Sequence, residues 1–179
     1  MSEMTVVALD AMGGDNAPGE MIKGAVEAVR KRSDMKVLLV GKQDLIEEAL
    51  AGYTYPKEQI EVVHASEVIE TAEPPVLAIR RKKDSSLVKA MQLVKNKEAD
   101  ALVSAGSSGA ILVGGQVLVG RIPGVNRAPL APLIPTAKGM SLLIDCGANV
   151  DARPAHLVQF AKMGSIYMEH VIGKKNPTV

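Results

Sequence analysis

The sequence predicts an α/β fold built on a doubly wound sheet that is parallel or mixed. Short apolar runs that suit buried strands alternate with segments of helical periodicity. Three of these runs end on a small acid or hydroxyl residue, Asp10, Ser104 or Asp145, and turn at once through glycine. A parallel sheet places the carboxyl ends of its strands at one edge, where ligands collect. We therefore expect the three loops to face one crevice.

Composition narrows the possible classes of protein. A chain of 179 residues with 47% apolar content can bury one sizeable core, which predicts one domain. A net charge of +1 and only four aromatic residues argue against a nucleic-acid-binding protein. The lone Cys146 fits a reducing cytoplasm. The uncharged stretch 101–120 has the length of a membrane span, but its glycines and serines favour a buried strand followed by a buried helix.

Periodicity and flanking residues predict the individual elements. Strands are expected where aliphatic residues run together, at residues 5–9, 36–40, 60–64, 101–104 and 141–145. Helices are expected with Pro18 in the first turn, at residues 44–50, from Pro74-Pro75, after a cap at Ser85 or Ser86, at residues 108–119 and from Pro154. Asp15 or Asn16 can cap the first helix and Asp151 the last. Four prolines predict an extended loop at 122–135, with room for a short edge strand.

The second glycine loop, residues 104–109, is the best candidate for an anion site. Its backbone N–H groups and the hydroxyls of Ser107 and Ser108 suit a phosphate at a helix start, although an ordinary serine cap is the alternative. The loop lacks the Walker lysine and a full G-x-G-x-x-G, so it does not support an ATPase or a dinucleotide-binding protein. Gly114 and Gly115 each cost a helix about 1 kcal/mol against alanine, which close packing or a close ligand must offset.

Cationic side chains are also needed for a phosphate site. Binding phosphate at millimolar concentration requires about 4 kcal/mol, whereas a helix end supplies about 0.3 to 1 kcal/mol. The nearest candidates are the run Arg80-Arg81-Lys82-Lys83 and the isolated Arg127. The alternative for these residues is a solvated helix end and a loop salt bridge.

The first loop offers a second group of candidates. Asp10, Asp15 and Asn16 suit metal binding, the positioning of a nucleophile, or simple helix capping. Capping explains Asp15 or Asn16 but leaves Asp10 and the adjacent Gly13-Gly14 unexplained.

In the third loop, Asp145 and Asn149 likewise suit metal binding, the positioning of a nucleophile, or simple capping. His156 lies just beyond this loop and is a candidate functional residue. Cys146 could accept an acyl group, but a buried free cysteine is the commoner case.

Taken together, these segments resemble the bacterial PlsX-type phosphate acyltransferases of phospholipid synthesis. The matching blocks are the opening signature 8–18, the basic loop 81–87, the second glycine loop 103–110, the segment 124–127 and the block 145–164. Two departures are mild. Ser107-Ser108 replaces the more frequent Asn-Thr, and Arg127-Ala128-Pro129 reorders the usual Arg-Pro-Ala.

The resemblance implies a Rossmann-like three-layer α/β/α fold with a largely parallel sheet, related to isocitrate and isopropylmalate dehydrogenases. Residues 1–179 would be the N-terminal part of a single α/β phosphate acyltransferase fold that ends before its C-terminal half. The implied reaction transfers a fatty acyl group from acyl-acyl-carrier-protein to inorganic phosphate, without a cofactor. The implied protein is a cytoplasmic homodimer with at most peripheral membrane contact, and it passes acyl phosphate to a membrane glycerol-3-phosphate acyltransferase.

The loops and the resemblance together indicate a set of site residues without any metal ligand. The expected catalytic residues are Asp10, Asn149 and His156. The expected substrate- or phosphate-binding residues are Gly13, Gly14, Asp15, Asn16, Arg81, Lys82, Ser104, Gly106, Ser107, Ser108, Gly109, Arg127, Asp145, Gly147 and Ala148. Phosphate can attack a thioester without strong base catalysis, so holding it and stabilising the oxyanion are the main tasks.

Three alternatives stay open. Two are other enzymes of the same fold, namely a phosphate acetyltransferase and a metal- and NAD-dependent hydroxy-acid dehydrogenase. The third is a non-catalytic, membrane-peripheral partner of a glycerol-phosphate acyltransferase.

Overall fold

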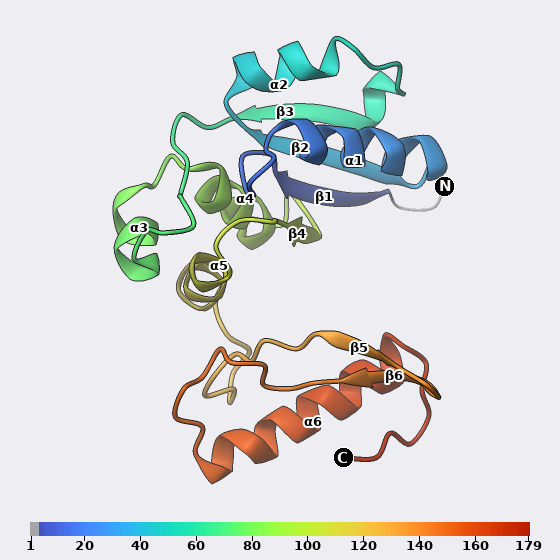
Figure 1. Ribbon diagram of the computed structural model, residues 1–179, viewed down its shortest axis with the longest axis vertical. Coiled ribbons are helices and arrows are strands. Elements are labelled where there is room, and N and C mark those ends of the chain that lie inside the picture. The colour runs from blue at the N-terminus through green and yellow to red at the C-terminus, as the bar shows by residue number, and fades with distance from the viewer. Residues whose placement is uncertain (1–3) are drawn as a thin grey trace. The chain divides into compact units, whose positions relative to one another are not determined.

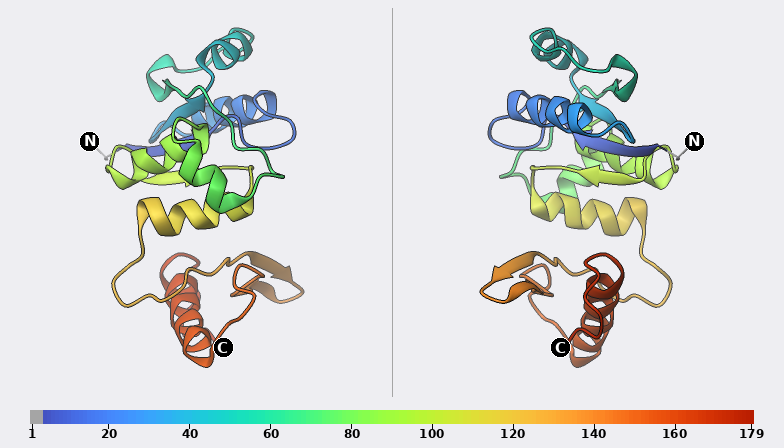
Figure 2. Two further views of the ribbon diagram at one scale, coloured as in Figure 1. Left: turned by 90° about the vertical axis from the view of Figure 1, so that its left-hand side faces the viewer. Right: turned by 90° about the vertical axis from the view of Figure 1, so that its right-hand side faces the viewer.

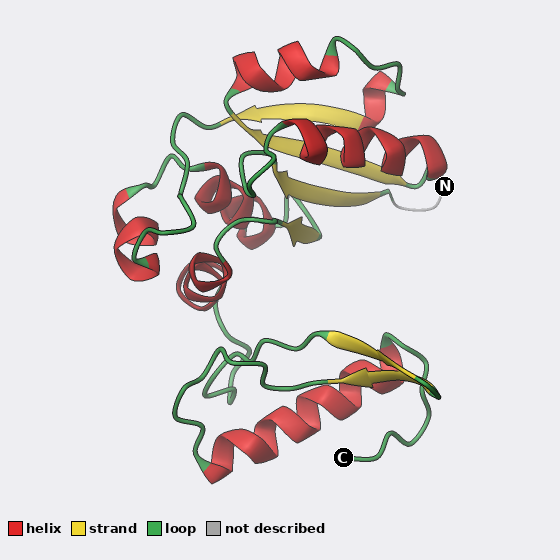
Figure 3. Cartoon of the chain, viewed as in Figure 1, coloured by secondary structure: helices red, strands yellow, loops and turns green. Residues whose placement is uncertain are grey.

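Four parallel strands form the main sheet (Figure 1). In spatial order they are β3 (Ile60–His64), β2 (Met35–Gly41), β1 (Thr5–Asp10) and β4 (Ala101–Val103). Leu9 of β1 pairs with Leu39 on one side and with Val103 on the other. The arrows of these four strands in Figure 3 point toward the same edge of the sheet, as the parallel pairing requires. The predicted α/β class with a largely parallel sheet is confirmed.

The computed structural model describes residues 4–179. Within that range the chain divides into two compact units, with the boundary between Gly120 and Arg121. The four-stranded sheet belongs to the first unit. Residues 121–179 pack as a unit of their own, and the expectation that both units belong to one domain stays a prediction.

Helices cover both faces of the sheet, which gives the first unit three layers (Figures 1 and 2). On one face, α1 (Gly19–Lys31) and α2 (Gln43–Leu50) enclose an apolar core. On the other face, α4 (Ser86–Lys95) packs on the side chains of alternate strand residues. The predicted strands and helices of this part are confirmed, apart from small differences at their ends. A short 3₁₀ turn, η1 (Lys57–Gln59), precedes β3.

The start of α1 differs from the prediction. Neither Asp15 nor Asn16 caps the helix with its side chain, because the helix begins at Gly19 and its N-cap is Pro18. The carbonyl of Asn16 accepts a hydrogen bond from the Glu20 N–H at 3.2 Å, so the backbone of this turn takes over the capping role. Both side chains are exposed.

The remaining helices of the first unit pack together beside the sheet. They are α3 (Pro75–Arg81), α5 (Ser108–Gly114) and the π-helical turn η2 (Gly115–Val119), which continues α5. A Cβ on Gly114 would overlap Met91 Sδ and would lie 3.1 Å from Ile79 Cδ1. Close packing on α4 and α3 therefore explains Gly114, whereas a Cβ on Gly115 would meet nothing within 4 Å.

We expect Gly114→Val to destabilise the fold by about 1 to 3 kcal/mol, because its side chain overpacks the contact with Met91. Gly115→Ala is the matched control, and it should gain up to about 1 kcal/mol from helix propensity. Urea unfolding followed by circular dichroism measures both. Equal midpoints for the two variants would show that the contact between α5 and α4 is looser than described.

The second unit consists of a hairpin and a helix. Strands β5 (Leu133–Thr136) and β6 (Gly139–Leu142) pair antiparallel, and α6 (Pro154–His170) follows. The short edge strand expected near residue 135 is confirmed. The expected strand 141–145 is wrong in its bounds, since β6 ends at Leu142. The next residue on the partner strand is Pro132, which has no N–H to extend the ladder.

Helix α6 begins at Pro154, as predicted, but its cap differs from the prediction. The expected cap was Asp151, but the N-cap residue is Arg153. The Arg153 N–H donates a hydrogen bond to Nδ1 of His156 at 3.2 Å. The imidazole therefore satisfies a backbone donor at the start of the helix. Among residues 4–179, no helix is both long and apolar enough to cross a membrane.

Candidate functional site

The carboxyl ends of β1 and β4 bring together two residues that are 94 positions apart. Asp10 ends β1 and is only 2% exposed, and Ser104 directly follows β4. The Ser104 hydroxyl donates to Asp10 Oδ2 at 2.8 Å and accepts from the Gly106 N–H at 3.1 Å. The Met12 N–H donates to Asp10 Oδ1 at 3.3 Å. This chain of hydrogen bonds links the first glycine loop to the second.

Glycines allow the two loops to touch. A Cβ on Gly13 would lie 2.5 Å from Asp10 Oδ2 and 2.9 Å from Ser104 Oγ. Gly14 has a φ of 110°, which side chains rarely adopt, and a Cβ there would lie 3.2 Å from Ala105 Cβ. The structure thus brings Asp10, Gly13, Gly14, Ser104 and Gly106 into one cluster at the sheet edge. Asp15 and Asn16 lie further along the same loop and face solvent.

The start of α5 adds backbone donors beside this cluster. Ser107 Oγ accepts from the Ala110 N–H at 3.3 Å and is buried, so its side chain acts as the helix cap. Ser108 is exposed. The N–H groups of Ser108 and Gly109 belong to the first helical turn, where the helix itself supplies no acceptor. At this helix start, the backbone and Ser108 are therefore better placed for an anion than the Ser107 hydroxyl.

The predicted basic segment is only partly available to a ligand. The Lys82 ammonium pairs with Glu73 and donates to the Val68 carbonyl at 2.7 Å. The hydrogen bond from Lys82 lowers the pKa of the Glu73 carboxyl. Lys82 therefore holds a turn in place, whereas Arg81 and the neighbouring Lys83 are exposed.

Asp84 anchors this segment to the end of β3, a role that the sequence analysis missed. Its carboxylate accepts hydrogen bonds from the Ser66 N–H at 2.9 Å and the Ser66 hydroxyl, and it pairs with Lys89 Nζ at 2.6 Å. Lys89 also donates to the carbonyl of His64, the last residue of β3. The hydrogen bond from Lys89, followed by those from Ser66, places the pKa of Asp84 well below its usual value. The signal was present, because Asp84 lies inside the matched block 81–87.

We expect acid to weaken this anchor. The pKa of Asp84 is lower in the folded protein, so the stability it contributes is complete above the unfolded pKa of about 4 and is lost as pH falls through the folded value. The melting temperature of Asp84→Asn should therefore lie below wild type at pH 6, and the gap should narrow below about pH 4. The exposed Asp44→Asn serves as control. A gap that stays constant from pH 6 to pH 3 would contradict the assignment.

The third loop lies in the second unit and is internally well connected. Asp145 Oδ1 accepts from the Leu130 N–H at 2.7 Å, and Oδ2 accepts from the Asn149 N–H at 2.7 Å and from Asn149 Nδ2 at 3.1 Å. Asn149 Nδ2 also donates to the Ala128 carbonyl at 3.1 Å. Asp145 and Asn149 thus fasten this loop to the residues after Arg127, whose own side chain is exposed.

Electrostatics agree with an anchoring role for Asp145. Partial burial opposes its ionisation, but the donated hydrogen bonds from Leu130, Asn149 and Ala148 prevail and lower its pKa. Because the Asn149 N–H is committed to this carboxylate, it is not an oxyanion donor in this arrangement. Gly147 has a φ of 79° and open space around it.

His156 and Cys146 are the remaining candidate residues of the second unit. The His156 Nδ1 accepts the Arg153 N–H, and its ring lies 6.3 Å from that of the buried Phe160. Cys146 is half-buried. The structure describes a helix-capping role for His156, and its expected catalytic role stays a prediction.

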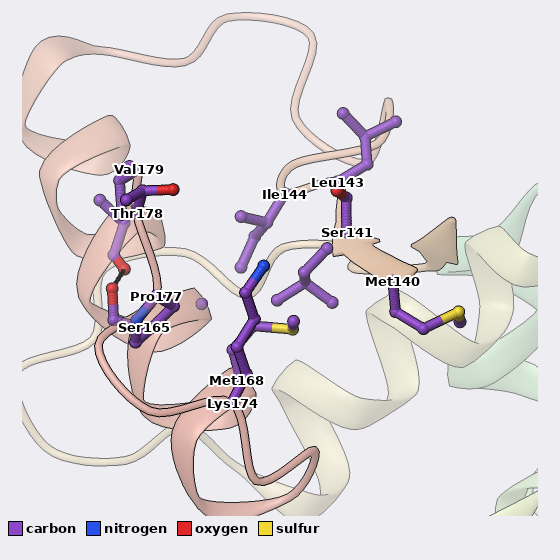
Figure 4. Close-up of a pocket in the computed structure, with 13 residues that line it drawn as sticks. Met140, Ser141, Leu143, Ile144, Ser165, Met168, Lys174, Pro177, Thr178 and Val179 are labelled. Carbon is purple, nitrogen blue, oxygen red and sulfur yellow. Dashed lines mark hydrogen bonds between the residues drawn. The ribbon is translucent and has the colours of Figure 1, made fainter. Parts of the chain in front are cut away.

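The second unit also contains a hollow of about 360 Å³ between β6 and α6 (Figure 4). Ile144, Met168 and Lys174 are among the residues that line it. None of the expected site residues contributes to its lining. Among residues 4–179, no group of three or more His, Cys, Asp or Glu side chains is arranged to hold a metal ion.

Comparison with known protein families shows which family the chain is similar to. A family model described as "Fatty acid synthesis protein" matches residues 5–179. The chain belongs to that family. It is 55% identical over 173 residues to a phosphate acyltransferase of Alkaliphilus oremlandii, covering 97% of this chain and 51% of that one. It is 50% identical over 173 residues to a phosphate acyltransferase of Clostridium novyi, covering 97% and 52%. The chain thus spans about half the length of these relatives.

Solved structures share the fold. The structure matches a phosphotransacetylase from Streptococcus pyogenes with a TM-score of 0.68 at 13% identity, over 96% of this chain and 55% of that one. The EutD phosphotransacetylase from Staphylococcus aureus matches with a TM-score of 0.66 at 17% identity, over 95% and 54%. These likenesses support the α/β architecture.

Proposed function

We propose that this chain is part of an acyltransferase that moves a fatty acyl group from acyl-acyl-carrier-protein to inorganic phosphate, giving acyl phosphate for phospholipid synthesis. The observation that carries the proposal is the contact between the two glycine loops through Asp10 and Ser104. It lies at the carboxyl edge of a parallel sheet, where such folds bind ligands. Relatives that are about half identical to the chain are named phosphate acyltransferases, which supports the reaction class.

The reaction requires these residues to bind and orient phosphate and to stabilise the oxyanion, without strong base catalysis. An oxygen of the hydrogen phosphate dianion attacks the thioester carbonyl carbon, and the carbon–sulfur bond breaks as the tetrahedral intermediate collapses. The phosphate proton passes to the departing thiolate, so acyl phosphate and free carrier-protein thiol result. The N–H groups of Ser108 and Gly109 would hold the phosphate or the oxyanion. Asp10 is buried and hydrogen-bonded, so we assign it to positioning the loops.

Asp145, Asn149 and Arg127 of the second unit keep their predicted roles in this proposal. Arg127 is exposed beside a loop that Asp145 and Asn149 hold rigid, so it suits a phosphate contact. We include Gly147 and Ala148 of the same loop as expected substrate contacts, and His156 of α6 as an expected catalytic residue. A homodimer, a cytoplasmic location with peripheral membrane contact, and transfer of the product to a membrane glycerol-3-phosphate acyltransferase belong to the proposal as well.

The test uses a complete chain, made by joining residues 1–179 to the remaining half of the Alkaliphilus oremlandii relative. With long-chain acyl-acyl-carrier-protein, hydroxylamine should trap acyl hydroxamate only when phosphate is present. Acetyl-CoA in place of the acyl carrier protein tests the acetyltransferase alternative, and NAD with a hydroxy acid tests the dehydrogenase alternative. Absence of phosphate-dependent hydroxamate from a folded chain refutes the proposal.

The exposed basic residues Arg81 and Lys83 should guide the acidic carrier protein. We expect Arg81→Glu with Lys83→Glu to lower kcat/KM for acyl-acyl-carrier-protein by about tenfold at low ionic strength, with the loss shrinking in high salt. The rate with a small acyl thioester should stay unchanged. Lys95→Glu, at the far end of α4, is the matched control. A rise in the KM for phosphate would instead assign these residues to phosphate binding.

A further inference from the structure

One face of the sheet is left partly uncovered beside α1. A groove of about 340 Å³ runs along β1 and β4 next to this helix, within the first unit. Its floor is formed by Val7, Leu9 and Val103, and α1 contributes Met21 and Ala25 to its wall. Glu20 is the only charged residue among those that line it. Figure 1 shows β1 and β4 extending past α1 on this side of the sheet.

The pattern of β4 shows that this part of the face is apolar although, among residues 4–120, no helix covers it. Ala101 and Val103 point away from α4, and Val103 is 51% exposed. Leu102, between them, packs on the opposite face into the cores around α4. Alternate residues of a strand face opposite sides of a sheet, and a strand with two apolar faces is typical of a sheet buried on both sides.

Small residues on the wall of the groove leave room for a second helix to pack against α1. Gly24 and Ala28 are one turn apart on α1 and both line the groove. A Cβ on Gly24 would meet nothing within 4 Å, so the space beside it is open. Small residues one turn apart let two helices approach closely. The groove is thus shaped for a helix that lies beside α1 and over β1 and β4.

We propose that this groove receives an apolar helix from the half of the family chain that residues 1–179 do not include. The relatives are about twice as long as this chain, so they contain enough sequence for further helices. Strand β4 has β1 as its one neighbour in the described sheet, so a further parallel strand can pair beside it. Parallel strands are joined by crossover helices that cover a sheet face. The occupant is a segment of the same polypeptide, not a lipid or a second copy.

Thiol accessibility tests the proposal. Cys146 is first replaced by serine, since it is the lone cysteine of the chain. Val103→Cys then reports on the groove, and Glu48→Cys reports on an exposed position of α2 on the same face of the sheet. Ala90→Cys, at a fully buried position of α4, reports on folding. Each variant is made in residues 1–179 and in the complete chain described above, and its labelling by a maleimide is timed.

We expect Val103→Cys to label about tenfold more slowly in the complete chain than in residues 1–179, at every protein concentration, while Glu48→Cys labels equally in both. Equal labelling at position 103 in the two chains overturns the proposal. Protection already present in dilute residues 1–179 would mean that the groove is covered from within this chain. Protection that grows with protein concentration would mean a second copy, and either result also overturns the proposal.

Folding of the shorter chain is checked independently. If Ala90→Cys labels rapidly in residues 1–179, that chain is unfolded and the comparison moves into the complete chain. There, Val103→Cys should label about tenfold more slowly than Glu48→Cys. Labelling of these two variants at the same rate would then refute the proposal.

Discussion

Replacing Ser104 by alanine is expected to lower kcat/KM for acyl transfer to phosphate by about 10- to 100-fold in the complete chain, because a displacement of about 1 Å near the chemistry can cost about 100-fold. The Ser104 hydroxyl donates to buried Asp10 and accepts from the Gly106 N–H, so it sets the spacing of the two loops. Its loss leaves a buried carboxylate without one partner, at a cost of about 1 to 3 kcal/mol. Steady-state kinetics and urea unfolding measure the two effects.

A double-mutant cycle makes this prediction specific. Asp10→Asn, Ser104→Ala and the double variant should show a coupling energy of about 0.5 to 3 kcal/mol, since the two side chains are in contact. Amide hydrogen exchange at Gly106 should accelerate in Ser104→Ala, because its N–H loses an acceptor. Ser33→Ala, at an exposed serine near the opposite edge of the sheet, should change neither quantity. Additive effects with unchanged exchange at Gly106 would contradict a positioning role.

The link between Asp10 and Ser104 was predictable in outline from the sequence. Both residues end apolar runs and precede glycines, and parallel strands place such ends at one edge. That β4 lies next to β1 decides their direct contact, and strand order depends on long-range packing. The sequence pattern therefore predicts that both residues lie at the carboxyl edge of the sheet, and the strand order explains why Asp10 and Ser104 touch.

Other features could not be read from local patterns. The anchor of the basic segment joins Asp84 to Ser66, two residues separated by a helix and a turn. The start of α1 was predicted from the capping preference of Asp15 and Asn16, but the backbone of this turn competes with the side chains for the same donors. The end of β6 depends on where Pro132 falls in the partner strand. In the first and third cases a contact between residues distant in sequence decides the outcome, and in the second a local backbone hydrogen bond does.

Gly13→Ala is the last expected result, and it should impair activity more than Ser104→Ala does. Gly13 has no left-handed φ, so alanine is conformationally acceptable and the variant reports on space alone. The new methyl carbon would lie 2.5 Å from Asp10 Oδ2, and Asp10 cannot swing aside because it is buried and hydrogen-bonded. The two loops must therefore separate, at a cost of about 1 to 3 kcal/mol in stability and a loss of about 100-fold or more in kcat/KM.

The origin of this loss can be tested in the Asp10→Ala background. Removing the carboxylate makes room for the methyl group, so Gly13→Ala should cost much less stability there than in wild type. Gly52→Ala, at a turn glycine with nothing within 4 Å of a Cβ, is the control for a general effect of losing a glycine. Urea unfolding and steady-state kinetics of Gly13→Ala, Asp10→Ala, the double variant and Gly52→Ala show whether the clash with Asp10 causes the loss. A Gly13→Ala enzyme with wild-type activity would show that the loops need not touch, and that the contact through Asp10 and Ser104 does not organise the site.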